Sequence, residues 1–323
     1  MHFLTKIKRV ILTSTPVKFV IRKSKKIIPP GFHGIPLFDV VNFFIIQIRK
    51  TSLNERAAAI AFNLLMAIPP ACIFLFTLIP FLPVKGLMYE VYELIRDVIP
   101  GQKENSVIIN FLQDFTTRQR NDLLSFGFIL ALYFSSNAMI GIMQSFNKMQ
   151  YIGFSKRHAL HDRWVAIKLT VIMFVIIILS IAALVARGPV LDLLGIQDPT
   201  TRTFIFNIRW VVIVFLFFFT ISFIYRHAPA VQKKWKLVNP GSLLATILML
   251  TFTMLFSYWV VNFGNYNKLY GSIGTILILM LLIFFNSLVL LIGFELNVSI
   301  NSLRKIADQR KNPGADGFHN SKK

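Results

Sequence analysis

Residues 272–298, SIGTILILMLLIFFNSLVLLIGFELNV, decide the class of this protein. A helix that crosses a bilayer needs about 20 mainly apolar residues, because the hydrocarbon core is ~30 Å thick and a helix rises ~1.5 Å per residue. This stretch is longer than that and carries one charged residue, Glu295. It therefore predicts a membrane-spanning helix.

Other stretches of the chain are apolar enough to span as well, at 57–83, 123–147, 165–186 and 241–263. A sixth, 204–225, is interrupted by Asn207 and Arg209, but an arginine near a helix end can extend its charge to the interface. Hydrophobic residues make up 55% of the chain, more than a soluble domain normally covers. We therefore predict an all-α integral membrane protein with six transmembrane helices.

The basic residues favour one side of this layout. Of 35 Lys and Arg residues, 25 lie before the first predicted span, in the loops 148–164 and 226–240, and after the last span. The alternate loops hold 9. Because basic loops stay in the cytoplasm, both termini are expected there. The net charge of +21 then reflects membrane topology, so we expect anionic lipids as partners at the cytoplasmic face and no nucleic acid.

The segments outside the spans complete the layout. We divide the chain into a basic N-terminal segment (1–35), a membrane domain (36–303) and a polar tail (304–323). Residues 37–48 are apolar but too short to span, so they predict an interfacial helix that begins after Pro36. The outer loop 84–122 repeats apolar residues at helical spacing and predicts two short amphipathic helices. The tail from Asn312 is predicted to be disordered.

Polar residues follow helical faces on three of the predicted spans. Lipid offers no hydrogen-bond partner, so each of these side chains needs one inside the protein. The candidates for lining a polar cavity are Arg56, Asn63, Asn137, Gln144, Lys148, Asn286, Glu295 and Asn297. On the first span, Pro69 and Pro70 are expected to kink or break the helix, as in transporters whose interrupted spans line a substrate site.

Two interpretations of these polar faces remain open. In the first, Asn63, Asn137 and Asn286 face one another around a hydrated cavity near the middle of the membrane. In the second, the polar residues are contacts between helices, with close packing at Gly141 and Gly293. A cavity favours transport, whereas contacts favour a structural role.

Glu295 is expected to have a basic partner. The alternating directions of the spans place it at the cytoplasmic end of the last span, where an unpaired buried carboxylate would cost several kcal/mol. Arg56 on the first span and Lys148 after the second lie at the same end. We predict Arg56 as the partner, with Lys148 as the second choice.

The sequence offers no catalytic centre. His158, His161 and Asp162 are a local group of metal-ligand types, but they lack the pattern that a two-zinc hydrolase needs. The chain has no glycine-rich phosphate loop, and its single cysteine, Cys72, lies in an apolar run. We therefore predict no catalytic residues, no metal, no cofactor and no enzyme activity.

Two motifs resemble a known family of proteins. Residues 56–62, RAAAIAF, with Ile68-Pro69-Pro70 after them, resemble the start of the first span in the YihY/virulence factor BrkB family. Residues 269–274 and 291–297 resemble its last span and contain the motif positions Tyr270, Gly271, Gly274 and Gly293. The resemblance covers about 35–305 and implies a bacterial inner-membrane protein with six spans and a role in envelope integrity or transport. Some members carry the label ribonuclease BN, but the histidines of such a nuclease are absent here.

Three functions follow as hypotheses. The leading one is a transporter-like or lipid-handling membrane protein with a polar cavity, which contributes to envelope integrity. The alternative is a scaffold that holds other envelope proteins and transports nothing. A membrane-bound hydrolase or ribonuclease ranks last, because the sequence lacks its site. A second copy of the chain is a further candidate partner.

Overall fold

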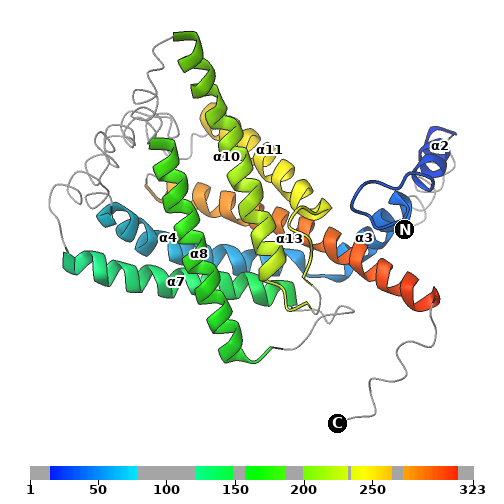
Figure 1. Cartoon of the computed structure of the whole chain (residues 1–323), viewed down its shortest axis with the longest axis horizontal. Helices are drawn as coiled ribbons and strands as arrows, with labels where there is room; N and C mark the ends of the chain where they lie inside the picture. Colours follow the sequence, from blue (N-terminus) through cyan, green and yellow to red (C-terminus); the bar gives the residue numbers. More distant parts are fainter. Residues whose placement is uncertain are drawn as a thin grey trace.

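The computed structural model describes residues 15–78, 121–147, 157–185, 199–231, 234–263 and 272–311, and its elements in these ranges are α-helices. They are α2 (Thr15–Ser24), α3 (Leu37–Lys50), α4 (Leu53–Leu78), α7 (Asn121–Asn147), α8 (Ala159–Val185), α10 (Pro199–His227), α11 (Pro240–Phe263) and α13 (Ser272–Lys311), shown in Figure 1. The all-α prediction is confirmed. The helices expected in 84–122 and the tail from Asn312 lie outside the described residues.

Four of the described helices are long and apolar enough to cross a membrane, namely α4, α7, α11 and α13. They coincide with the first, second, fifth and sixth predicted spans. α8 and α10 coincide with the third and fourth, and α10 contains a shorter apolar helix, Val214–His227. The chain is therefore a multi-pass membrane protein.

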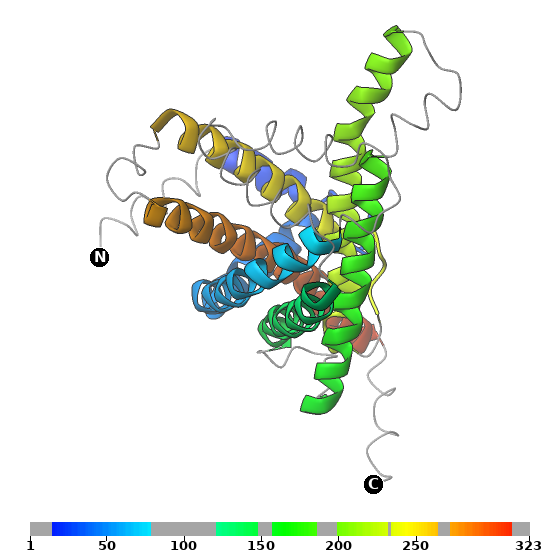
Figure 2. The ribbon, with the colours of Figure 1, turned by 90° about the vertical axis from the view of Figure 1, so that its left-hand side faces the viewer.

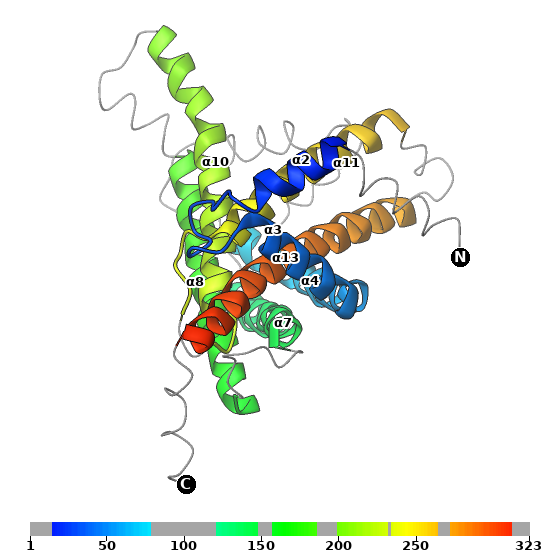
Figure 3. The same cartoon turned by 90° about the vertical axis from the view of Figure 1, so that its right-hand side faces the viewer.

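The helices do not all run in the same direction. α4 packs along α7, α11 packs along α13, and α13 also packs against α4. α8 and α10 run across these four helices, as the three views in Figures 1, 2 and 3 agree. Hydropathy predicts where a helix lies in the sequence, but the angle at which it crosses its neighbours depends on side-chain packing, and here it differs from an aligned six-helix bundle.

Pro69 and Pro70 do not break the first span. Both lie inside α4, which is one helix from Leu53 to Leu78. A proline removes a single backbone N–H, and packing against a neighbouring helix can hold a membrane helix together across that loss. α4 packs along α7 more extensively than any other pair of described helices. The expected break, which favoured a transporter, is therefore absent.

Burial is uneven along the helices. The ends of α4, α7, α11 and α13 that contain Arg56, Phe146, Gly241 and Phe294 form a core of buried side chains, which we call the packed half. The other ends of α11 and α13 form what we call the open half. Of the residues whose burial is described, none is buried in 250–262 of α11 or in 276–286 of α13. The packed half is the end that the charge pattern predicts to be cytoplasmic.

α3 begins after Pro36, as expected, and packs against α13. Val40 of α3 shares a small apolar cluster with Phe32 and Ile35 of the preceding loop and with Ile300 of α13. These contacts fix the loop before α3 onto the last helix, outside the packed half.

Candidate functional site

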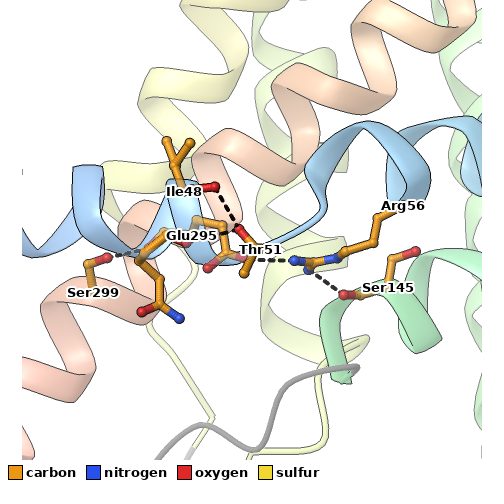
Figure 4. Close-up of polar contacts among 7 residues, drawn as sticks. Ile48, Thr51, Arg56, Ser145, Glu295 and Ser299 are labelled. Atoms are coloured by element: carbon orange, nitrogen blue, oxygen red, sulfur yellow. Dashed lines mark hydrogen bonds and ion pairs between the residues drawn. The ribbon is translucent and has the colours of Figure 1, made fainter. Parts of the chain in front are cut away.

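A buried ion pair lies in the packed half. The Arg56 Nη1 atom of α4 donates a hydrogen bond of 2.8 Å to the Glu295 Oε1 atom of α13, and the two side chains are 2% and 0% exposed (Figure 4). The first choice of partner for Glu295 is thus confirmed. Lys148, the second choice, lies outside the described residues.

Arg56 joins a third helix to this pair. Its Nη2 atom donates to the carbonyl oxygen of Ser145 in the last turn of α7 (Figure 4). The last carbonyl groups of a helix have no partner within the helix and carry the negative end of its dipole, so they favour a cation. Because a buried pair is tolerated only with such added hydrogen bonds, this contact stabilises the charge of Arg56 as well as joining α4, α7 and α13.

Asn297, one of the cavity candidates, fixes the start of α11. Its Oδ1 atom accepts a bond of 2.8 Å from the backbone N–H of Gly241, and its Nδ2 atom donates to Asn239 Oδ1 at 2.6 Å. Asn239 Oδ1 also accepts from the backbone N–H of Ser242 at 2.8 Å, which is how an asparagine caps a helix. Asn297 therefore satisfies polar groups at the start of the neighbouring helix.

Two glycines let α11 and α13 touch through their backbones. A Cβ atom added at Gly241 would lie 2.1 Å from the carbonyl oxygen of Gly293, and one added at Gly293 would lie 2.6 Å from that of Gly241. Beside them, the Tyr225 hydroxyl of α10 donates to the Leu290 carbonyl at 2.5 Å. Close contact at Gly293 is what the packing interpretation predicts.

The first two asparagines of the proposed cavity contact different helices. Asn63 of α4 donates to the carbonyl of Ala59 at 3.0 Å and lies against Gly141 of α7, where an added Cβ would be 2.7 Å from Asn63 Nδ2. Asn137 of α7 instead accepts a hydrogen bond from Arg163 of α8. One face of α7 therefore packs on α4 and another on α8.

Asn286 lies elsewhere, between α13 and α11. Its Nδ2 atom donates to the Leu282 carbonyl at 3.0 Å and approaches Thr253 Oγ1 of α11 at 3.4 Å. The structure thus does not bring Asn63, Asn137 and Asn286 together, because each lies against a different neighbouring helix, α7, α8 and α11 respectively. This corrects the expectation that the three face one shared space.

The remaining candidates are more scattered. Gln144 is exposed on α7, and Gly274 is buried near the start of α13. Tyr270 and Gly271 lie outside the described residues. In the described part of the chain, no three His, Cys, Asp or Glu side chains are placed to hold a metal ion. Asp162 instead lies 3.9 Å from Arg157.

Sequence reasoning missed three residues of this region. Arg163, which binds Asn137, also lies over the Tyr133 ring at 5.0 Å. Tyr225 and Asn239 connect α10 and the start of α11 to α13. An asparagine immediately before a proline and a long apolar run is a helix-start signal that could have identified Asn239. Nothing in the spacing indicates Arg163 or Tyr225.

Comparisons with known proteins give a consistent result. Residues 44–317 match the family described as virulence factor BrkB. The ribonuclease-like protein YfkH of Bacillus subtilis (strain 168) is 29% identical over 261 residues, covering 79% of this chain and 93% of YfkH. A UPF0761 membrane protein of Legionella pneumophila (strain Corby) is 24% identical over 283 residues, covering 86% of this chain but 65% of that relative. No solved structure matches this chain.

Proposed function

This chain belongs to the virulence factor BrkB family, and from that premise we propose that it spans the bacterial inner membrane six times with both termini in the cytoplasm. α8 and α10 are then the third and fourth spans. The support is the separation of 25 basic residues from 9 across the predicted loops. α8 and α10 run across the other helices (Figure 2), so a four-span arrangement is the competing topology.

Reporter fusions separate the two topologies. With six spans, a fusion after Gly195, between α8 and α10, should read external, whereas with four spans it should read cytoplasmic. Fusions within 148–164 and after Lys323 should read cytoplasmic in both cases and serve as controls, and a fusion near Gln102 should read external in both. A cytoplasmic signal at Gly195 would overturn the six-span proposal, and one at Gln102 would overturn both topologies.

We propose further that the protein is transporter-like and handles a lipid rather than a water-soluble solute. The observation that carries this is the difference between the two halves. The packed half joins α4, α7 and α13 through Arg56 and Glu295, and it leaves the polar candidates bound to neighbouring helices. The open half exposes large apolar side chains such as Met254, Leu255 and Ile276. A lipid chain can enter between such helices, whereas a soluble solute requires a hydrated path.

Asn286 and Thr253 give the open half a polar element. Thr253 is exposed, and the two side chains approach each other at 3.4 Å, a long distance for a hydrogen bond. A polar pair at a lipid-accessible surface is costly unless it meets another polar group. We propose that the Asn286–Thr253 pair contacts the polar part of an amphipathic substrate. The Arg56–Glu295 pair would then close the cytoplasmic end in this conformation.

A lipid-translocation assay tests this function. The purified protein is placed in vesicles with a fluorescent phosphatidylglycerol, and lipid exposed at the outer leaflet is quenched, with and without an imposed proton gradient. We expect faster translocation than in protein-free vesicles, and Asn286→Leu to slow it about tenfold through the loss of a polar contact worth about 1.4 kcal/mol.

The control is Asn262→Leu, the same change at an exposed position of α11, where the amide donates to the Tyr258 carbonyl of its own helix. This variant should translocate lipid as the unaltered protein does. The scaffold hypothesis predicts that the unaltered protein gives the same rate as protein-free vesicles, with or without the gradient. A nuclease role is not proposed, because the sequence lacks the histidine pattern of a two-zinc hydrolase.

A further inference from the structure

A pocket of about 630 Å³ lies beyond the packed half, where α13 leaves the predicted membrane region. Its walls are the loop before α3, the segment between α10 and α11, and the polar end of α13. The residues that line it include Asn239, Pro240 and Asn297. The volume is in the range of pockets that hold small ligands.

The loop that forms one wall is held in place by the fold. Gly31 and His33 have φ angles of 88° and 53°, in the left-handed region that glycine adopts readily and other residues seldom do. A Cβ atom at Gly31 would lie 2.9 Å from Pro240 Cγ, so glycine also permits the approach to α11. Phe32 and Ile35 are buried against α13. The pocket wall is therefore anchored at both sides of His33.

The charged side chains around the pocket are mostly basic. Lys234 and Lys236 line it from the segment before α11, and Arg304 and Lys305 line it from α13. The acidic residue among the lining residues, Asp308, lies 3.8 Å from Arg304 and is largely exposed. Four cations around one acid leave a positive site.

Two further features point to an anion. The Arg304 Nη1 atom lies 3.3 Å from His33 Nδ1. Partial burial lowers the pKa of His33, and the nearby charges of Arg304 and Lys236 lower it further. Pro240, the first residue of α11, lines the pocket, so the positive end of that helix dipole lies beside it. The N–H groups of Gly241 and Ser242 are already bound by asparagines, so the basic side chains remain to contact a ligand.

We propose that this pocket binds a phosphate group, carried either by the headgroup of an anionic lipid or by a soluble phosphate compound. Arg304 would contact the phosphate oxygens with its planar guanidinium, while the lysines contribute point charges. The site is independent of the translocation function above. It lies outside the open half and does not use Asn286.

Binding by the purified full-length protein in a neutral detergent tests the proposal. Two probes are titrated separately at constant ionic strength, a short-chain phosphatidylglycerol and inorganic pyrophosphate, with short-chain phosphatidylcholine as the neutral-headgroup comparison. Replacing Lys236 and Arg304 together by glutamine should weaken binding roughly 30-fold, because each cation at a surface site contributes about fivefold. Tighter binding of phosphatidylglycerol identifies a lipid site, and tighter binding of pyrophosphate identifies a soluble ligand.

The matched control replaces Lys50 and Arg49 by glutamine. These two residues are exposed at the end of α3, outside the pocket, and their loss removes the same charge. The control should bind as the unaltered protein does. Equal weakening in both double variants, or no binding of either charged probe by the unaltered protein, would overturn the proposal. Thermal unfolding checks that each variant folds. If the double variant with Lys236 and Arg304 replaced does not fold, the single variant Lys236→Glu is used in its place.

Discussion

Replacing Glu295 by alanine should lower the free energy of unfolding by about 3–5 kcal/mol, the usual cost of removing one member of a buried ion pair. Arg56 would keep its charge at a position where its side chain is 2% exposed, with the carboxylate 2.8 Å away removed. Arg56→Ala should lower the free energy of unfolding by a similar amount, because the buried Glu295 carboxylate would lose its pairing with Arg56. Unfolding by sodium dodecyl sulfate titration in mixed micelles measures both changes.

The control for this prediction lies one residue from Arg56. Glu55 is exposed, so Glu55→Ala should change stability by less than about 0.5 kcal/mol. The double variant Arg56→Met with Glu295→Leu should be more stable than either single variant, because it leaves no buried charge. If the double variant is as unstable as the sum of the two single variants, the ion pair is not what sets the cost.

Gly241→Ala should lower the free energy of unfolding by about 3 kcal/mol, through overpacking and the loss of a buried hydrogen bond. The added Cβ would lie 2.1 Å from the Gly293 carbonyl oxygen and 2.5 Å from the side chain of Asn297. Since backbone atoms cannot move aside as a flexible side chain can, α11 and α13 must separate. That movement would break the bond between Gly241 N–H and Asn297.

Gly127→Ala is the matched control for the glycine prediction. Its Cβ would meet Ile73 at 3.4 Å, an ordinary contact, and alanine is the better helix former by about 1 kcal/mol. This variant should be as stable as the unaltered protein or slightly more so. Thermal unfolding in detergent compares the two, and equal midpoints for Gly241→Ala and Gly127→Ala would contradict a close backbone contact between α11 and α13.

Much of the helix layout could be predicted, because it depends on local sequence. Long apolar runs predicted α4, α7, α11 and α13, and Pro36 marked the start of α3. The pairing of Arg56 with Glu295 could also be predicted, since the direction of each span places both at the same end, where a buried charge needs an opposite one.

The partners of the asparagines could not be predicted in this way. Asn137 binds Arg163 because α8 crosses α7, and Asn286 meets Thr253 because α11 lies beside α13. Hydropathy and charge carry no information on which helices become neighbours or at what angle. The expectation of a shared cavity assumed neighbours that the packing does not provide. Pro69 and Pro70 likewise lie inside one continuous helix, α4, which packs extensively along α7.

The distance along the chain between Arg56 and Glu295, 239 residues, affects how the protein is made. At a synthesis rate of about 5–20 residues per second, the first helix waits roughly 12–48 s for the last one to emerge from the ribosome. During that interval the guanidinium has to stay hydrated near the membrane surface, so the helix cannot take its final depth. Biogenesis is therefore completed only when the final helix inserts. If synthesis stops before the final helix is made, the unfinished bundle is exposed to membrane proteases.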